Sequence, residues 1–238
     1  MAKISNSKPK ESSGAYERIF GNKELGDLIT RVHSTSITNG NELEKIILNH
    51  CKDNNYLIED FDDFIENSYS FINTDNIIKV VRKKVIKKSQ ILQNISKKKD
   101  NVNFEPDFVV LKIDKNNKCC YVIELKDGFE FDTKKISGER QHLEEFANFI
   151  AKKIPYCIFI KFCCFNENDK KKIKNGLKGE FEIEEIMTGN EFCDLLNINY
   201  KEIIELRKAD VEENIEFFVK ELLKIENVRK LVEKYIHS

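Results

Sequence analysis

The chain has 238 residues, 40% hydrophobic and 34% charged, so it can bury a full core, and one main domain is expected. A formal net charge of −1 excludes a uniformly basic nucleic-acid-binding protein, although not a local basic face. The apolar runs are too short for a membrane span and the N-terminus lacks the apolar core of a signal peptide. We therefore expect a flexible tail over residues 1–13 and a single domain over residues 14–238, whose last part, from about residue 189, is helical.

The cysteine pattern favours a reducing compartment. Seven is an odd number, no C-x-x-C spacing occurs, and the four histidines lie at no metal-like interval from the cysteines. Free cysteine behaves as a small hydrophobe, and disulfides are rare in the cytoplasm. We predict a cytoplasmic protein with buried free thiols at Cys51, Cys119, Cys120, Cys157, Cys163, Cys164 and Cys193.

Residues 17–53 have a helical pattern. Thr38-Asn39-Gly40-Asn41 resembles a helix start, and it is followed by residues at helical spacing that are expected to form a buried stripe: Leu43, Ile46, Ile47 and His50. Glu44 lies on the flank of this stripe. An acid in a first helical turn can simply complement the helix dipole, so a functional role for Glu44 is an alternative to that structural one.

A one-sided basic run follows. Between residues 79 and 99 there are nine lysines and arginines and no acid, and the run includes Arg82 and Lys83. A solvated face with a flexible loop and a surface that tracks DNA or RNA phosphates both explain such a run. The apolar spacing of residues 77–86 fits helix and strand about equally poorly, so their structure stays open.

Residues 106–126 read as two buried strands joined by a tight turn. Glu124 and Lys126 are two apart on a strand and therefore share a face. A two-residue loop at Lys115-Asn116 sets Asp107 opposite Glu124, and a loop at Asn116-Asn117 sets it opposite Lys126. Either register clusters the three charged side chains, whereas a three-residue loop would turn Asp107 to the other face.

Charges buried in apolar strands are costly unless something compensates them. The carboxylates of Asp107 and Glu124, with the carbonyl of Leu125, are oxygen donors suited to a hard cation such as Mg²⁺. Lys126 could orient a water molecule or stabilise a developing anion. The structural alternative is a chance Pro-Asp dipeptide beside a surface ion pair.

A helix and further strands come next. Ser137 is a plausible N-cap for a helix that Pro155 stops, and residues 156–165 are apolar on both sides, as in a central strand. Strand, helix and strand form a βαβ unit, which predicts a parallel pair. Residues 180–187 are expected to form an edge strand, and the remaining chain to be helical over residues 190–196, 200–206 and 210–236.

Pro106-Asp107, the short hairpin and Glu124-Leu125-Lys126 together resemble the signature of the PD-(D/E)xK nucleases. The order helix, strand, strand, helix, strand is similar to that family's core. The resemblance implies an α/β, restriction-endonuclease-like fold, a central mixed sheet flanked by helices, with a helical C-terminal extension. Residues 126–139 and the chain length resemble type II restriction endonucleases within the family. Glu44 resembles an extra acidic motif of many members, which implies a contact to metal or water.

The resemblance implies Mg²⁺-dependent hydrolysis of phosphodiester bonds in double-stranded DNA at a specific sequence. Asp107, Glu124, Lys126 and Glu44 would be catalytic, and Asp107, Glu124 and Leu125 would hold the metal. A homodimer is expected, with a cognate DNA methyltransferase as a genetic partner. Alternatives within the fold are a repair, resolvase or mobile-element nuclease and a non-catalytic DNA-binding module. The residues expected to contact DNA fall into two groups. Ser137, Arg140 and Gln141 are candidates for base contacts in the major groove, although Gln141 also fits a solvated helix position. The candidates for phosphate contacts are Lys134, Lys135, Arg82 and Lys83.

Overall fold

The computed structural model describes residues 3–7, 14–96, 105–115, 117–129, 131, 133–208 and 211–236. The chain forms two compact units. One consists of Met1–Ile47 with Lys201–Ser238, and the other of Leu48–Tyr200. Each unit is described here by itself. The prediction of one domain over residues 14–238 stays a prediction.

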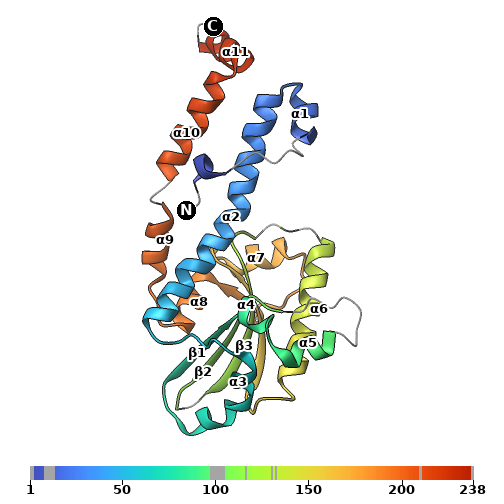
Figure 1. The fold of residues 1–238 in the computed structure, drawn as a ribbon, viewed down its shortest axis with the longest axis vertical. Coiled ribbons are helices and arrows are strands. Elements are labelled where there is room, and N and C mark those ends of the chain that lie inside the picture. Colours follow the sequence, from blue (N-terminus) through green and yellow to red (C-terminus); the bar gives the residue numbers. More distant parts are fainter. Residues whose placement is uncertain are drawn as a thin grey trace. The chain divides into compact units, whose positions relative to one another are not determined.

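The first unit is helical (Figure 1). Near the N-terminus, in the segment predicted to be a flexible tail, the backbone N–H of Ile4 donates to Asn214 Oδ1 at 2.8 Å, and the Ile4 side chain is buried. The unit's elements are η1 (Ile4–Asn6), α1 (Gly14–Phe20), most of α2 (Lys23–Asp53), α9 (Tyr200–Lys208), α10 (Val211–Lys224) and α11 (Glu226–Ile236).

One long helix, α2, replaces the predicted helix start at residues 38–41. The expectation was wrong because the hydroxyls of this region do not cap a helix. Thr38 Oγ1 donates to the carbonyl of Ser34 at 3.0 Å, and Thr35 Oγ1 donates to that of Arg31 at 2.8 Å. Such bonds to the preceding turn satisfy the hydroxyls of Ser and Thr within a continuous helix. Buried Leu43 and Ile47 continue its apolar stripe.

The second unit contains a five-stranded sheet in the order β1-β2-β3-β4-β5. β1, β2 and β3 pair antiparallel, while β3, β4 and β5 pair parallel, so the sheet is mixed. The elements are α3 (Phe61–Glu66), η2 (Ser68–Asn73), β1 (Ile77–Arg82), α4 (Lys83–Ile86), α5 (Gln90–Ser96), β2 (Phe108–Ile113), β3 (Lys118–Lys126), α6 (Thr133–Ile150), β4 (Cys157–Cys164), α7 (Lys170–Gly176), β5 (Ile186–Thr188) and α8 (Gly189–Leu195).

The predicted fold class is confirmed: a central mixed sheet is flanked by helices, consistent with a restriction-endonuclease-like core. The βαβ unit is confirmed as well, because β3 and β4 are parallel and α6 connects them. The open question over residues 77–86 resolves into a strand, β1, followed by one short helix, α4.

Side-chain alternation divides the core between the two faces of the sheet. On one face, Val109, Val122 and Phe162 belong to the core cluster that includes Leu143 and Phe146 of α6, which lies alongside the sheet in Figure 1. On the other face, Phe108 of β2 packs against Phe192 of α8, with ring centroids 5.7 Å apart. By the same alternation, Asp107 and Glu124 lie on the face of the sheet that packs against α6.

Several predicted boundaries differ from the structure. Helix α6 begins at Thr133 rather than at Ser137, because Ile136 is buried in the core and anchors an earlier first turn. Strand β4 is not buried throughout: Cys157 and Phe159, near its start, are exposed. The edge strand is confined to β5. The single helix predicted over residues 210–236 is divided at Ile225 into two helices, α10 and α11.

All seven cysteines are free thiols. Five are buried, Cys119 is intermediate and Cys157 is exposed, so the prediction of buried thiols holds for five positions. Burial raises the pKa of the Cys51 thiol to about 12, which keeps it protonated at neutral pH. In the described part of the chain, no helix is both long and apolar enough to cross a membrane.

Candidate functional site

The hairpin register brings the predicted charged cluster together. Ile113 of β2 pairs with Lys118 of β3, and Phe108 pairs with Ile123. One further step in this register sets Asp107 opposite Glu124. This is the arrangement expected for a two-residue loop, so the even loop on which the prediction depended is confirmed.

Two buried carboxylates occupy this end of the hairpin, and each has a lysine partner. Asp107 is 7% exposed and Glu124 is 3% exposed. Lys126 forms an ion pair with Glu124, and Lys83 Nζ lies 3.1 Å from Asp107 Oδ1. The backbone N–H of Leu125 donates to Asp107 Oδ2 at 2.9 Å. Both acids therefore have positive or N–H partners, as buried carboxylates require.

The backbone explains why Lys83 reaches the site. Its N–H donates to the carbonyl of Asp107 at 2.9 Å, one step beyond the pairing of Arg82 with Phe108. The β1–β2 ladder thus continues past the end of β1 and sets Lys83 beside Asp107. Charge alone did not predict this pairing, because the sequence offers many lysines in the same basic run.

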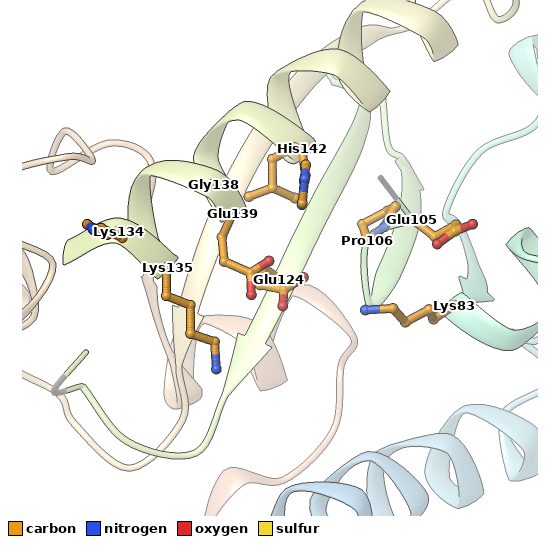
Figure 2. Close-up of a pocket in the computed structure, with 10 residues that line it drawn as sticks. Lys83, Glu105, Pro106, Glu124, Lys134, Lys135, Gly138, Glu139 and His142 are labelled. Carbon is orange, nitrogen blue, oxygen red and sulfur yellow. The ribbon is translucent and has the colours of Figure 1, made fainter. Parts of the chain in front are cut away.

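A cavity of about 350 Å³ opens beside Glu124 and the Glu105-Pro106 segment that precedes Asp107 (Figure 2). Glu124 lines it from β3, Lys83 reaches in from one side, and Glu139 points from α6 towards Glu124. The complete lining is Lys83, Glu105, Pro106, Glu124, Lys134, Lys135, Gly138, Glu139, His142 and Leu143. A lining that combines acidic groups with lysines suits a phosphate that is held by a bridging cation.

Burial and neighbouring charges change the protonation behaviour of the site. Burial, followed by the negative charge of Asp107, raises the pKa of Glu124 to about 7, although Lys126 opposes the shift. Burial lowers the pKa of Lys126, but the charges of Glu124 and Asp107 raise it more, and the result is about 12. Lys126 is therefore cationic at neutral pH, whereas Glu124 is only partly ionised near pH 7.

This donor set fits a hard divalent cation. Two buried carboxylates lie side by side, and each already holds a cationic ammonium group. Among the described residues, no cluster of three or more His, Cys, Asp or Glu side chains could hold a metal. Two carboxylates, supplemented by the Leu125 carbonyl, water and substrate oxygens, are the sparse oxygen ligation typical of Mg²⁺.

The predicted phosphate contacts separate into two groups. Lys83, Lys134 and Lys135 all line the cavity. Arg82 does not; it lies 3.4 Å from Glu59. Glu44 is half-buried on α2 in the first compact unit, and its catalytic role stays a prediction.

The three predicted base-reading residues of α6 differ in what they contact. Arg140 donates to both carboxylate oxygens of Glu185, at 2.7 and 3.0 Å, and its guanidinium lies 5.2 Å from the centroid of the Phe181 ring. Ser137 donates to Glu180 at 2.9 Å. Gln141 is exposed and donates to Glu145 at 2.9 Å. Arg140 is therefore engaged in holding the segment after α7 against α6.

Three cavity residues with ionisable side chains were not among the predicted site residues: Glu105, Glu139 and His142. Glu105 Oε2 is buried without a hydrogen-bond partner in the described structure. Glu139 Oε1 lies 3.7 Å from Lys126 Nζ. Helical periodicity could have indicated two of them, since Lys135, Glu139 and His142 follow an i, i+4, i+7 pattern and share one face of α6.

Comparison with known proteins gives one informative similarity. The chain is 44% identical over 236 residues to the type II restriction enzyme HhaII of Haemophilus parahaemolyticus; the alignment covers 99% of this chain and 100% of that protein. No protein-family model and no solved structure matches the chain.

Proposed function

Because the chain belongs to the family of type II restriction enzymes represented by HhaII, we propose that it is an endonuclease that cleaves double-stranded DNA at a specific sequence. The observation that carries the proposal is the position of Asp107 opposite Glu124 and beside Lys126, at the open end of the β2–β3 hairpin. This arrangement also supports membership of the PD-(D/E)xK superfamily, and we propose that Mg²⁺ is the cofactor.

Each residue of the cluster has a role in phosphodiester hydrolysis. Asp107 and Glu124, with the carbonyl of Leu125, would hold Mg²⁺. When bound, the cation lowers the pKa of a coordinated water and stabilises negative charge at phosphorus. Lys126, cationic at neutral pH, orients the attacking water through a hydrogen bond and offsets the charge that develops on the phosphate oxygens.

The DNA backbone would approach through the lysines of the cavity rim. Lys83, Lys134 and Lys135 have the charge to contact phosphates next to the scissile bond. Exposed Gln141 is the best supported candidate for a base contact, since an amide can bond adenine in a bidentate manner. Ser137, Arg140 and Arg82 remain proposed contacts that would have to exchange their present partners for DNA. Glu44 remains a proposed further acidic contact.

Cleavage of plasmid DNA tests the function. We expect discrete bands with Mg²⁺ and none after chelation. Lys126→Ala should lower the cleavage rate by at least roughly 10³-fold while DNA binding is retained, because the lysine acts on the reaction more than on the duplex. Lys172→Ala, a change of an exposed lysine on α7, is the matched control and should cleave normally.

Other outcomes would redirect the proposal. A smear or structure-dependent nicking would indicate a repair, resolvase or mobile-element nuclease. Salt-sensitive binding without any cleavage would indicate a non-catalytic DNA-binding module. Full activity in Lys126→Ala would show that the site is elsewhere.

We propose further that the enzyme acts as a homodimer in the cytoplasm, with a cognate DNA methyltransferase as its genetic partner. An exposed apolar stripe on α10 supports self-association: Ile215 is 59% exposed, Val219 44% and Leu223 38%, at a spacing of four residues.

Light scattering tests the dimer. The wild-type chain should give twice the chain mass of 27.9 kDa, and Val219→Lys should shift the mass towards one chain, because a charge buried at an interface is not compensated. Lys220→Ala on the same helix is the control. A wild-type monomer at micromolar concentration, with DNA present, would contradict the homodimer.

A further inference from the structure

Lys126 lies between two acids that come from different elements. Glu124 is two residues away on β3, and Glu139 comes from the first half of α6. The Lys126–Glu139 distance of 3.7 Å is longer than the ion pair with Glu124. Both acids line the cavity, and in Figure 2 the Glu139 side chain points towards the carboxyl group of Glu124. Among described residues, these are the two acids within ion-pair distance of Lys126.

The two acids cannot have equivalent roles if Glu124 holds a divalent cation. A cation on Glu124 would repel the ammonium that now pairs with it, and it would take up the carboxylate oxygens that accept from Lys126. Lys126 would then lose its main partner at the moment when its position matters for the reaction. Glu139 is close enough to retain the ammonium after a small rotation of the lysine side chain.

We propose that Glu139 is a positioning residue that holds the Lys126 ammonium in the site once a divalent cation occupies Asp107 and Glu124. The proposal rests on the proposed nuclease function and adds a residue to it. The burial of the pair supports the assignment: the Lys126 and Glu139 side chains are 23% and 22% exposed, so their attraction is screened less than on an open surface.

The same geometry suggests how α6 and β3 are coupled. Phosphate contacts through Lys134 and Lys135 would act on the turn of α6 that precedes Glu139. DNA engagement and the position of Lys126 are thus connected through one helical turn. Glu139 would not touch the reacting atoms; it would act through Lys126.

A double-mutant cycle on cation affinity separates positioning from direct ligation. Mn²⁺ binding to the whole protein is measured by calorimetry without DNA, for Glu139→Gln in the wild-type and the Lys126→Met backgrounds. Glu139→Gln should weaken Mn²⁺ binding in the wild-type background by a factor that is roughly three to ten times the factor in the Lys126→Met background. A coupling of this size is typical of residues in contact. The reason is that a lysine without Glu139 competes more strongly for Glu124.

Equal losses in both backgrounds would overturn the proposal, because they would mark Glu139 as a cation ligand or as a structural residue. No loss in either background would overturn it too. Single-turnover cleavage adds a second readout: Glu139→Gln should cleave at least roughly tenfold more slowly, with Glu139→Asp partly restoring the rate. Glu184→Gln, an exposed acid in the same unit, is the control.

Failure of this inference is distinguishable from failure of the proposed function. A wild-type protein that neither binds Mn²⁺ nor cleaves DNA would contradict the function itself. A wild-type protein that does both, with no excess loss in the cycle, would contradict the role of Glu139 alone. Thermal unfolding of each variant shows that a loss of affinity does not come from a loss of folding.

Discussion

Two glutamates beside α6 each pair with a cation, yet their pKa values are shifted in opposite directions. Glu185 accepts from both nitrogens of the Arg140 fork and from the N–H of Glu182 at 2.8 Å. Burial acts to raise the pKa of Glu185. The hydrogen bonds and the charge of Arg140 lower it by more, so the net shift is downward. For Glu124, burial and neighbouring acids outweigh Lys126, and the pKa rises to about 7.

The difference lies in the balance of charge and in exposure. The side chain of Glu185 is 22% exposed and has a rigid guanidinium aligned with it. Glu124 is 3% exposed and shares one lysine with Glu139, while Asp107 adds a further negative charge. The first pair stabilises the fold, whereas the second arrangement is unfavourable in the absence of an additional cation. An unfavourable, organised cluster in a cavity is a typical sign of a functional site.

The largest expected effect comes from removing the charge of Glu124. Its pKa is 4.5 without the protein environment and about 7 in the fold, so the ionised form opposes folding. This penalty is absent below pH 4.5, grows between pH 4.5 and 7, and is complete above pH 7. Glu124→Gln should therefore raise the free energy of unfolding by roughly 2–3 kcal/mol at pH 8 and hardly at all at pH 4.5.

Thermal unfolding at pH 4.5 and pH 8, with chelator present, measures this gain, and the same variant should have lost DNA cleavage. Glu184→Gln serves as the exposed control. A Glu124→Gln protein that is less stable than wild type at pH 8 would show that the cluster stabilises the fold, and the contrast with Glu185 would disappear.

Local sequence rules were sufficient to predict the arrangement of Asp107, Glu124 and Lys126 at the centre of the site. Strand parity set Glu124 and Lys126 on one face, and the even turn then aligned Asp107 with them, because a hairpin register follows from its loop. The parallel pairing of β3 with β4 followed from an intervening helix. These features depend on residues that are close in sequence, which is why the pattern predicts them.

Features that depend on distant partners were missed. The contact of Arg140 with Glu185, 45 residues away, was missed because nothing in the local pattern indicates it. Lys83 was one basic residue among many until the β1–β2 ladder set it beside Asp107. The uninterrupted course of α2 was missed because turn-forming residues at 38–41 suggested a boundary that tertiary packing overrides.

The smaller expected effect comes from the pair that stabilises the fold. Glu185→Gln removes the charge but can keep one hydrogen bond to Arg140, so we expect a loss of about 1 kcal/mol in the free energy of unfolding at pH 7. Because the pKa of Glu185 is lowered in the fold, its contribution is present above the usual value of 4.5 and is lost as the pH falls below it. Urea unfolding at pH 7 and at pH 4 should therefore show a difference between variant and wild type that shrinks in acid. A variant as stable as wild type at pH 7 would mean that the guanidinium of Arg140 is only weakly held by the protein. It would then be available to DNA, and the base contact predicted for this residue would gain support.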